Sequence, residues 1–344
     1  MRKFIILLLI LNSSLFCLAQ QYKVDITKAI IKDIPLSAVL LDFKTVDLVI
    51  PDGVEVKNVS VYYLKDGKYL VVENLESKAY LFDNHGGFIK EIDGDYTGNT
   101  FSFNPFVDVK RNSLYKDNLN EWIGIDILTN KVTKRVVKPK QLKDQIASFI
   151  QLSKNEYMGY VNNQTGNCNT LFAVFDVNGK ILWREPNNKA YTKVNVDSPF
   201  QRGSFYEYES HYYCLEPFMG TTVYEVGDNI LNPHIYFYAG DKTPIYEYQD
   251  LNRDNLNNKD EWKLSLVRET ETRIYFTYVT AKGMRWGYYD KKEDQAYITP
   301  ELPKTTKSDD ITDKNLRPSF IQDQYSVKSK LKGDTLKLVI GKFK

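Results

Sequence analysis

A sequence motif that recurs five times constrains the fold of this chain more than any other feature. Each copy is an apolar strand that ends in Asp or Glu, followed by a polar turn and a second strand. The acidic residues of the five copies are Asp83, Asp126, Asp176, Glu225 and Asp290. Neighbouring copies lie 43 to 65 residues apart, which is the length of a propeller blade rather than of a solenoid coil. The repeat therefore predicts an all-β propeller.

Strand-like segments between turn residues predict one domain over residues 20–344 with six four-stranded antiparallel blades. The C-terminal strands are too few for a whole blade, so we expect residues 316–344 to be completed by residues 22–50. Building one blade from both chain ends closes the ring and removes exposed sheet edges. The other predicted blades span residues 54–93, 103–138, 145–186, 203–240 and 262–300.

The first nineteen residues predict a secretory signal peptide. Arg2 and Lys3 precede an apolar run, and small residues at Cys17 and Ala19 suit cleavage after Ala19. The run is too short for a bilayer, which needs about 20 apolar residues. We therefore expect a secreted or periplasmic protein without a membrane span. A lipoprotein is disfavoured, because Phe16 precedes Cys17 where lipid attachment requires a small residue.

Bulk composition excludes several classes of partner. The chain has 46 Lys and Arg against 44 Asp and Glu, for a net charge of +2. It therefore lacks the broad positive electrostatic potential that favours binding of nucleic acid. Of the three cysteines, the two that follow the predicted signal peptide, Cys168 and Cys214, give no disulfide framework, and the sequence leaves open whether they pair. The three histidines lack metal-ligand spacing, and no serine-hydrolase or nucleotide motif is present. We expect a monomer.

A segment rich in tyrosine and carboxylates is the first candidate site. If it forms a single strand, alternation places Glu207, Glu209 and His211 on one face. Such a strand in the central channel could divide the acid and base roles of a polysaccharide hydrolase or lyase. The alternative is a solvent-facing strand whose charges are hydrated. Candidate ligand-binding residues in this segment are Arg202, Tyr206 and Tyr208.

A second candidate is a calcium loop in the most polar interval of the chain. Oxygen-bearing side chains fall at positions 1, 3, 5 and 12 of the calcium-loop pattern. Asn255 stands where the pattern has Gly, so an Asn-rich surface insertion explains the segment equally well. No other metal or cofactor is expected. The calcium candidates are Asp250, Asn252, Asp254 and Glu261.

Six segments carry a resemblance to known proteins: IPLSAVLLDF, KYLVVENLESKAYLFDNHGGFIKEI, LFAVFDVNGKI, GTTVYEVGDNILNPHIYFYAG, RIYFTYVTAKGMRWGYYDKKEDQAYI and LKLVIGKFK. With these segments the chain resembles a known family, the secreted six-bladed β-propeller proteins found widely in Bacteroides-like bacteria. The resemblance covers nearly all of the chain after residue 19. Members of that family mostly lack an assigned biochemical role, so the resemblance implies an architecture rather than an activity.

These observations favour an exported propeller that binds a protein or glycan at the cell envelope and is not an enzyme. The chain places its irregular polar sequence in loops, which a rigid ring presents at fixed positions. The alternative is the hydrolase or lyase with a site in the central channel. The loops in question are Asn162–Thr170, Tyr248–Trp262 and Glu301–Asp313.

Overall fold

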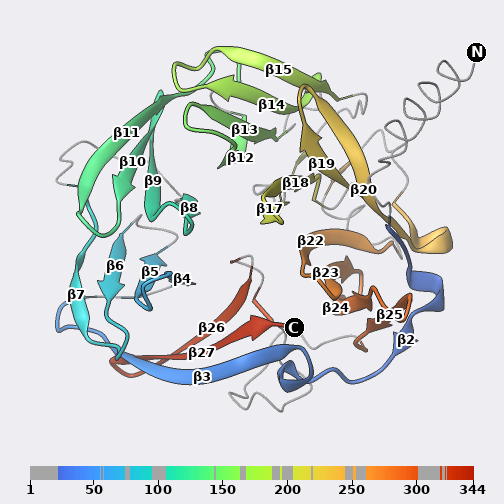
Figure 1. The fold of residues 1–344 in the computed structure, drawn as a ribbon, viewed down its shortest axis with the longest axis horizontal. Coiled ribbons are helices and arrows are strands. Elements are labelled where there is room, and N and C mark those ends of the chain that lie inside the picture. Colours follow the sequence, from blue (N-terminus) through green and yellow to red (C-terminus); the bar gives the residue numbers. More distant parts are fainter. Residues whose placement is uncertain are drawn as a thin grey trace, which may run out of the picture.

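The chain forms a ring of six β-sheets around a central axis (Figure 1). In the computed structural model, the described residues are 22–54, 56, 58–73, 78–94, 106–142, 145–162, 168–187, 194–195, 204–217, 220–244, 251–252, 261–300, 318–319, 322 and 324–344. Within these ranges, no helix is both long and apolar enough to cross a membrane. The predicted six-bladed propeller is confirmed.

Each of the first five blades contains four antiparallel strands, which follow one another from the axis outward. Blades one and two contain β4 (Val59–Tyr63), β5 (Tyr69–Glu73), β6 (Ala79–Phe82), β7 (Phe88–Glu91), β8 (Phe106–Asp108), β9 (Ser113–Asn118), β10 (Glu121–Asp126) and β11 (Lys131–Val137). Blades three and four contain β12 (Ile146–Gln151), β13 (Glu156–Val161), β14 (Thr170–Asp176), β15 (Ile181–Pro186), β17 (Ser204–Tyr208), β18 (His211–Leu215), β19 (Thr222–Gly227) and β20 (Ile230–Tyr238). Blade five contains β22 (Lys263–Glu269), β23 (Arg273–Thr280), β24 (Gly283–Asp290) and β25 (Gln295–Ile298).

The N-terminal segment runs around the outside of three blades in succession. Strand β1 (Tyr22–Asp25) pairs in parallel with β20, and β2 (Ile30–Ile31) pairs in parallel with β25. Strand β3 (Leu40–Val49) then pairs antiparallel with β27 (Thr335–Phe343), which also pairs with β26 (Tyr325–Lys332). Blade six is thus built from both chain ends, as predicted, with three strands among the described residues.

Short 3-10 turns connect and follow these strands. They are η1 (Ile26–Lys28), η2 (Leu36–Ala38) and η3 (Gly240–Lys242).

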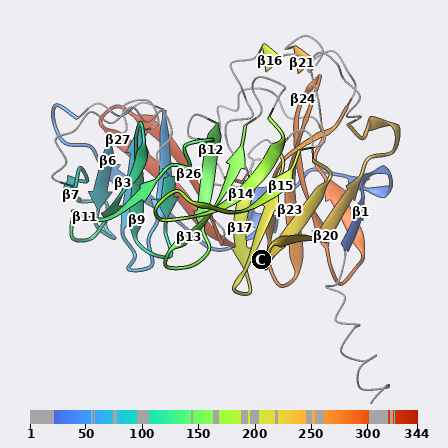
Figure 2. The same ribbon diagram turned by 90° about the horizontal axis from the view of Figure 1, so that it is seen from above.

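The two faces of the ring differ in their connections. On the hairpin face, the first strand of blades one to five turns into the second, at residues 64–68, 109–112, 152–155, 209–210 and 270–272. On the opposite face, here called the loop face, the chain passes from one blade to the next. Strands β16 (Val194–Asn195) and β21 (Leu251–Asn252) belong to two such connections and pair in parallel. Figure 2 shows them above the ring.

The repeated acidic residue is a turn cap in four of its five copies. Asp83 Oδ1 accepts hydrogen bonds from the backbone N–H groups of His85 and Gly87, at 2.8 and 2.9 Å. Asp126, Asp176 and Asp290 likewise accept from backbone N–H groups of their own turns. Short carboxylates stabilise turns in this way. Glu225 differs, because it lies inside β19.

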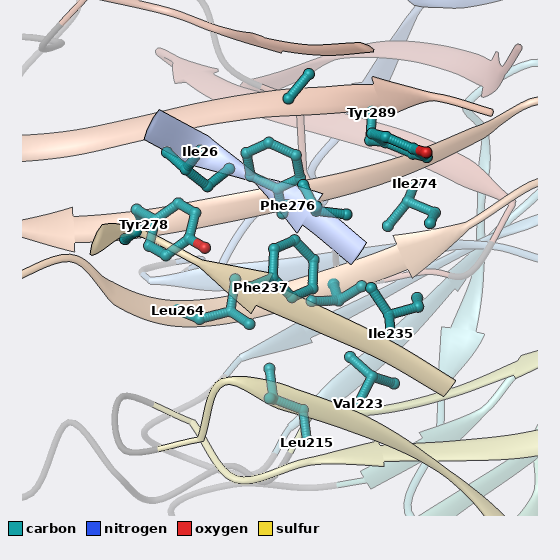
Figure 3. Close-up of a cluster of buried hydrophobic side chains, with 14 of the residues drawn as sticks. Ile26, Leu215, Val223, Ile235, Phe237, Leu264, Ile274, Phe276, Tyr278 and Tyr289 are labelled. Atoms are coloured by element: carbon teal, nitrogen blue, oxygen red, sulfur yellow. The ribbon is translucent and has the colours of Figure 1, made fainter. Parts of the chain in front are cut away.

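The cores lie between neighbouring blades. One of them joins blades four and five and includes Ile26 from the N-terminal segment, with Phe237, Phe276 and Tyr278 packed edge to face (Figure 3). A tyrosine near the start of the second strand is at most 5% exposed in each of the first five blades. These residues are Tyr69, Tyr115, Tyr157, Tyr213 and Tyr275. The ring is therefore held together by side chains packed between sheets.

Candidate functional site

The first candidate segment is a hairpin and not a single strand. Strand β17 ends at Tyr208 and β18 begins at His211, so Glu209 and Ser210 form a two-residue turn, with φ of 49° and 67°. Positive φ at both turn residues matches the twist of the flanking strands. Cross-strand partners share a face, and these are Tyr208 with His211 and Glu207 with Tyr212. The predicted common face is wrong: Glu207 and His211 lie on opposite faces of the sheet.

On the Glu207 face, blade four binds a turn of blade two. Lys110, from the β8–β9 turn, forms an ion pair with Glu207. Its neighbour Arg111 donates a hydrogen bond from Nη2 to the Tyr212 hydroxyl at 3.1 Å, and from Nη1 to Asp108 Oδ2 at 2.8 Å. Burial by itself would lower the pKa of Arg111, but the contacts with Tyr212 and Asp108 raise it. Glu207 is thus neutralised by a residue of the chain itself.

The other two predicted catalytic residues make local contacts on the opposite side of the hairpin. His211 Nδ1 lies 2.5 Å from Glu225 Oε1, with the imidazole 58% exposed. The Tyr208 hydroxyl donates to Glu209 Oε1 at 2.7 Å. Burial and this bond raise the pKa of Tyr208. On this side of the hairpin each of the two residues therefore has a partner within the chain: His211 contacts Glu225, and Glu209 accepts from Tyr208.

A buried charge cluster, which sequence reasoning missed, lies between blades four and five. The Glu269 side chain is 0% exposed; its Oε1 lies 2.7 Å from Lys291 Nζ and its Oε2 2.8 Å from His234 Nε2. The Tyr206 hydroxyl donates to Oε2 at 3.3 Å. His234 Nδ1 is buried and has no hydrogen-bond partner among the described residues. We call Glu269, His234 and Lys291 the interblade cluster.

Aromatic rings enclose the interblade cluster. Tyr213 stacks on Tyr206 at 4.9 Å and lies 4.6 Å from the His234 ring. The Lys291 ammonium lies 4.7 Å from the centre of the Tyr208 ring and 5.1 Å from that of Tyr22. Tyr206 is 1% exposed, so of the two predicted ligand-binding tyrosines only Tyr208 reaches the surface.

The electrostatics of the cluster favour an ionised carboxylate. Burial by itself would raise the pKa of Glu269. Its contacts with His234 and Lys291 outweigh burial and hold the pKa of Glu269 below its ordinary value. The sequence pattern gives no signal for this residue, because the alternating face of β22 that carries Glu269 also carries Lys263 and Ser265 beside Val267.

Two of the calcium candidates fall inside the described residues. Asn252 ends β21 and pairs with Asn195 across the two strands. Glu261 is buried, with Oε2 3.7 Å from Lys263 Nζ. Burial raises the pKa of Glu261, and Lys263 opposes that shift. Asp250 and Asp254, like the ligand candidate Arg202, lie outside the described residues, so calcium binding stays a prediction.

Metal-binding side chains do not gather elsewhere in the described residues: no group of three or more His, Cys, Asp or Glu there could hold an ion. Cys168 and Cys214 form no disulfide with each other. Cys214 is 0% exposed, and burial raises the pKa of its thiol well above the ordinary value.

Comparison with known proteins identifies one matching family model and several solved structures with a similar fold. A family model described as Domain of unknown function (DUF4934) matches residues 22–336. A Bacteroides fragilis protein described as exported shares 17% identity and a TM-score of 0.65, over 94% of this chain and 99% of that chain. A DUF4221 member from Bacteroides vulgatus shares 12% identity and a TM-score of 0.56, over 91% and 99%. Identities this low show the fold alone. No curated protein matches the chain.

Proposed function

This chain belongs to the DUF4934 family of domains of unknown function, and we propose that its propeller is a non-enzymatic binding scaffold. The partner is a protein or glycan at the cell envelope, and it binds on the loop face. The observation that carries this proposal is the β16–β21 pair, which joins two successive blade connections and stands above the ring in Figure 2.

Strand direction supports the choice of face. The loop within blade three begins after Val161, and the connections after blades four and five begin after Tyr238 and Ile298. All three of these strand ends lie at the loop face. A rigid ring that presents several loops on one face is well suited to binding.

On the hairpin face the turns are short, and three carboxylates of blades four and five already have partners in the chain. Glu207, Glu225 and Glu269 each contact a cation or imidazole. An envelope location is supported by the exported relative from Bacteroides fragilis. Export itself would require the predicted signal at residues 1–19.

The geometry does not favour the hydrolase or lyase alternative. Such an enzyme needs two carboxylates and an acid–base group that face one substrate. Here Glu207 is paired with Lys110, and His211 lies on the other side of the sheet.

A thermal-shift screen of the chain from Gln20 onward, against envelope glycans and candidate envelope proteins, tests the proposal. A ligand at about 100 times its Kd adds roughly 2.7 kcal/mol of stability. The loop-face variant replaces Asn195 and Asn252 with Lys, and the matched hairpin-face control replaces Asn155 and Asn178 with Lys. We expect a ligand whose shift is lost in the first variant and kept in the second. A shift lost only in the control would overturn the proposed face.

A further inference from the structure

Two blades that are not neighbours in the ring are joined by side chains. The β8–β9 turn of blade two reaches past blade three to the β17–β18 hairpin of blade four (Figure 1). Glu207 and Tyr212 are cross-strand partners on one face of that hairpin. They bind two consecutive residues of blade two, Lys110 and Arg111, so the contact has two points.

The two points differ in how firmly they are held. Arg111 is held in place by its own turn. Its backbone N–H and its Nη1 both donate to Asp108, whose side chain is only 7% exposed. Among the described residues, Lys110 makes no comparable bonds to Asp108, and its side chain is 51% exposed. A half-exposed ion pair is weak and is screened by salt. Lys110 is therefore the releasable half of the contact.

The hairpin that Lys110 holds ends in a strained turn. Its turn residues, Glu209 and Ser210, both adopt left-handed φ without being Gly or Asn, and such conformations persist only where the surroundings impose them. Phe205 and Cys214 share the face of Glu207 and Tyr212, and pack toward blade three. Movement of the hairpin away from Lys110 would expose that face.

We propose that Lys110 and Arg111 form a salt-sensitive latch that holds the β17–β18 hairpin against the ring, and that its release uncovers Glu207 and Tyr212. The latch is independent of which face binds a partner. Its opening would make the acidic and aromatic surface of blade four available under conditions that weaken the Lys110–Glu207 pair.

The chain carries its own reporter of this movement. Cys214 lies on the latched face and is 0% exposed, so its thiol reacts with a disulfide reagent only when the hairpin opens or the whole domain unfolds. The experiment measures that rate at low denaturant in the chain from Gln20, with Cys168→Ser to remove the second thiol. Lys110→Met removes the releasable half of the latch and leaves the Arg111–Tyr212 bond in place. Arg135→Met is the matched control, since the Arg135–Glu121 pair has similar exposure but lies within blade two.

We expect Lys110→Met to raise the rate roughly two- to five-fold, and Arg135→Met to leave it unchanged. In the parent protein the rate should rise with ionic strength, and in Lys110→Met it should not. Exchange of the two charges, Lys110→Glu with Glu207→Lys, should restore the slow rate. Equal rates in the two single variants would overturn the latch. So would an increase no larger than each variant's loss of global stability accounts for, measured by urea unfolding.

Discussion

Replacing Lys291 by Met removes the cation that faces the buried Glu269 carboxylate at 2.7 Å. Met has nearly the same volume, so the change leaves an uncompensated charge rather than a cavity. Breaking a buried pair in this way costs roughly 3 to 5 kcal/mol. Because His234 still contacts Oε2 at 2.8 Å, we expect the lower end, about 3 kcal/mol at pH 7. Urea unfolding followed by circular dichroism measures the loss.

The pH dependence of this loss has a definite sign. In the parent protein the pKa of Glu269 is lowered, so its contribution to stability is present above the unfolded value of about 4.3 and is lost as pH falls through the folded pKa. Without Lys291, burial raises that pKa and the carboxyl accepts a proton more readily. The difference between parent and variant should therefore shrink to about 1 kcal/mol near pH 3.

Lys292→Met is the control for the same experiment. Lys292 is the exposed neighbour of Lys291 in the same turn, and its bond to Asp290 uses the backbone N–H, which the variant keeps. It should change stability by less than about 0.5 kcal/mol. A loss that small for Lys291→Met, or one that does not vary with pH, would refute the account of the interblade cluster.

Three other substitutions test local features of the ring by urea or thermal unfolding. Ser210→Gly should stabilise the protein by about 1 kcal/mol, because Gly adopts the left-handed φ of 67° without strain; a loss would show that the turn is unstrained. Gly86→Ala should cost at least about 2 kcal/mol, since its Cβ would lie 2.1 Å from a backbone oxygen of β3, whereas Gly53→Ala, with open space around it, should cost about 1 kcal/mol. Equal costs would contradict the packing of β3 on blade one. Asp176→Ala removes two hydrogen bonds to the backbone of its turn and should cost about 1 kcal/mol; no change in the melting temperature would argue against capping.

Local sequence patterns predicted the parts of the fold that depend on local chemistry. The repeated Asp marks turns because its carboxylate caps the backbone within four residues, as Asp83 and Asp176 do. The closing strand was predictable because the C-terminus lacked strands for a whole blade. Residues 22–50 were expected to complete blade six, and the pairing of β1 and β2 with blades four and five was not predicted. Their parallel partners lie about 200 residues or more away and leave no local signal.

The candidate site was harder to predict for two physical reasons. The Glu209–Ser210 turn contains neither Gly nor Asn, so the hairpin looked like one alternating strand and His211 was assigned to the wrong face. Glu269 and Lys291 lie 22 residues apart in sequence but form one ion pair through the packing of strands within a blade. Nothing in the local pattern of either residue names the other as its partner.

Photo-crosslinking in intact cells tests the proposed function most directly. A photoreactive residue replaces Asn195 in β16 on the loop face or, as the control, Lys154 in a turn on the hairpin face. The account predicts an adduct with an envelope protein or glycan from position 195 and none from position 154. Adducts from position 154 alone, or from neither position, would contradict binding through the loop face.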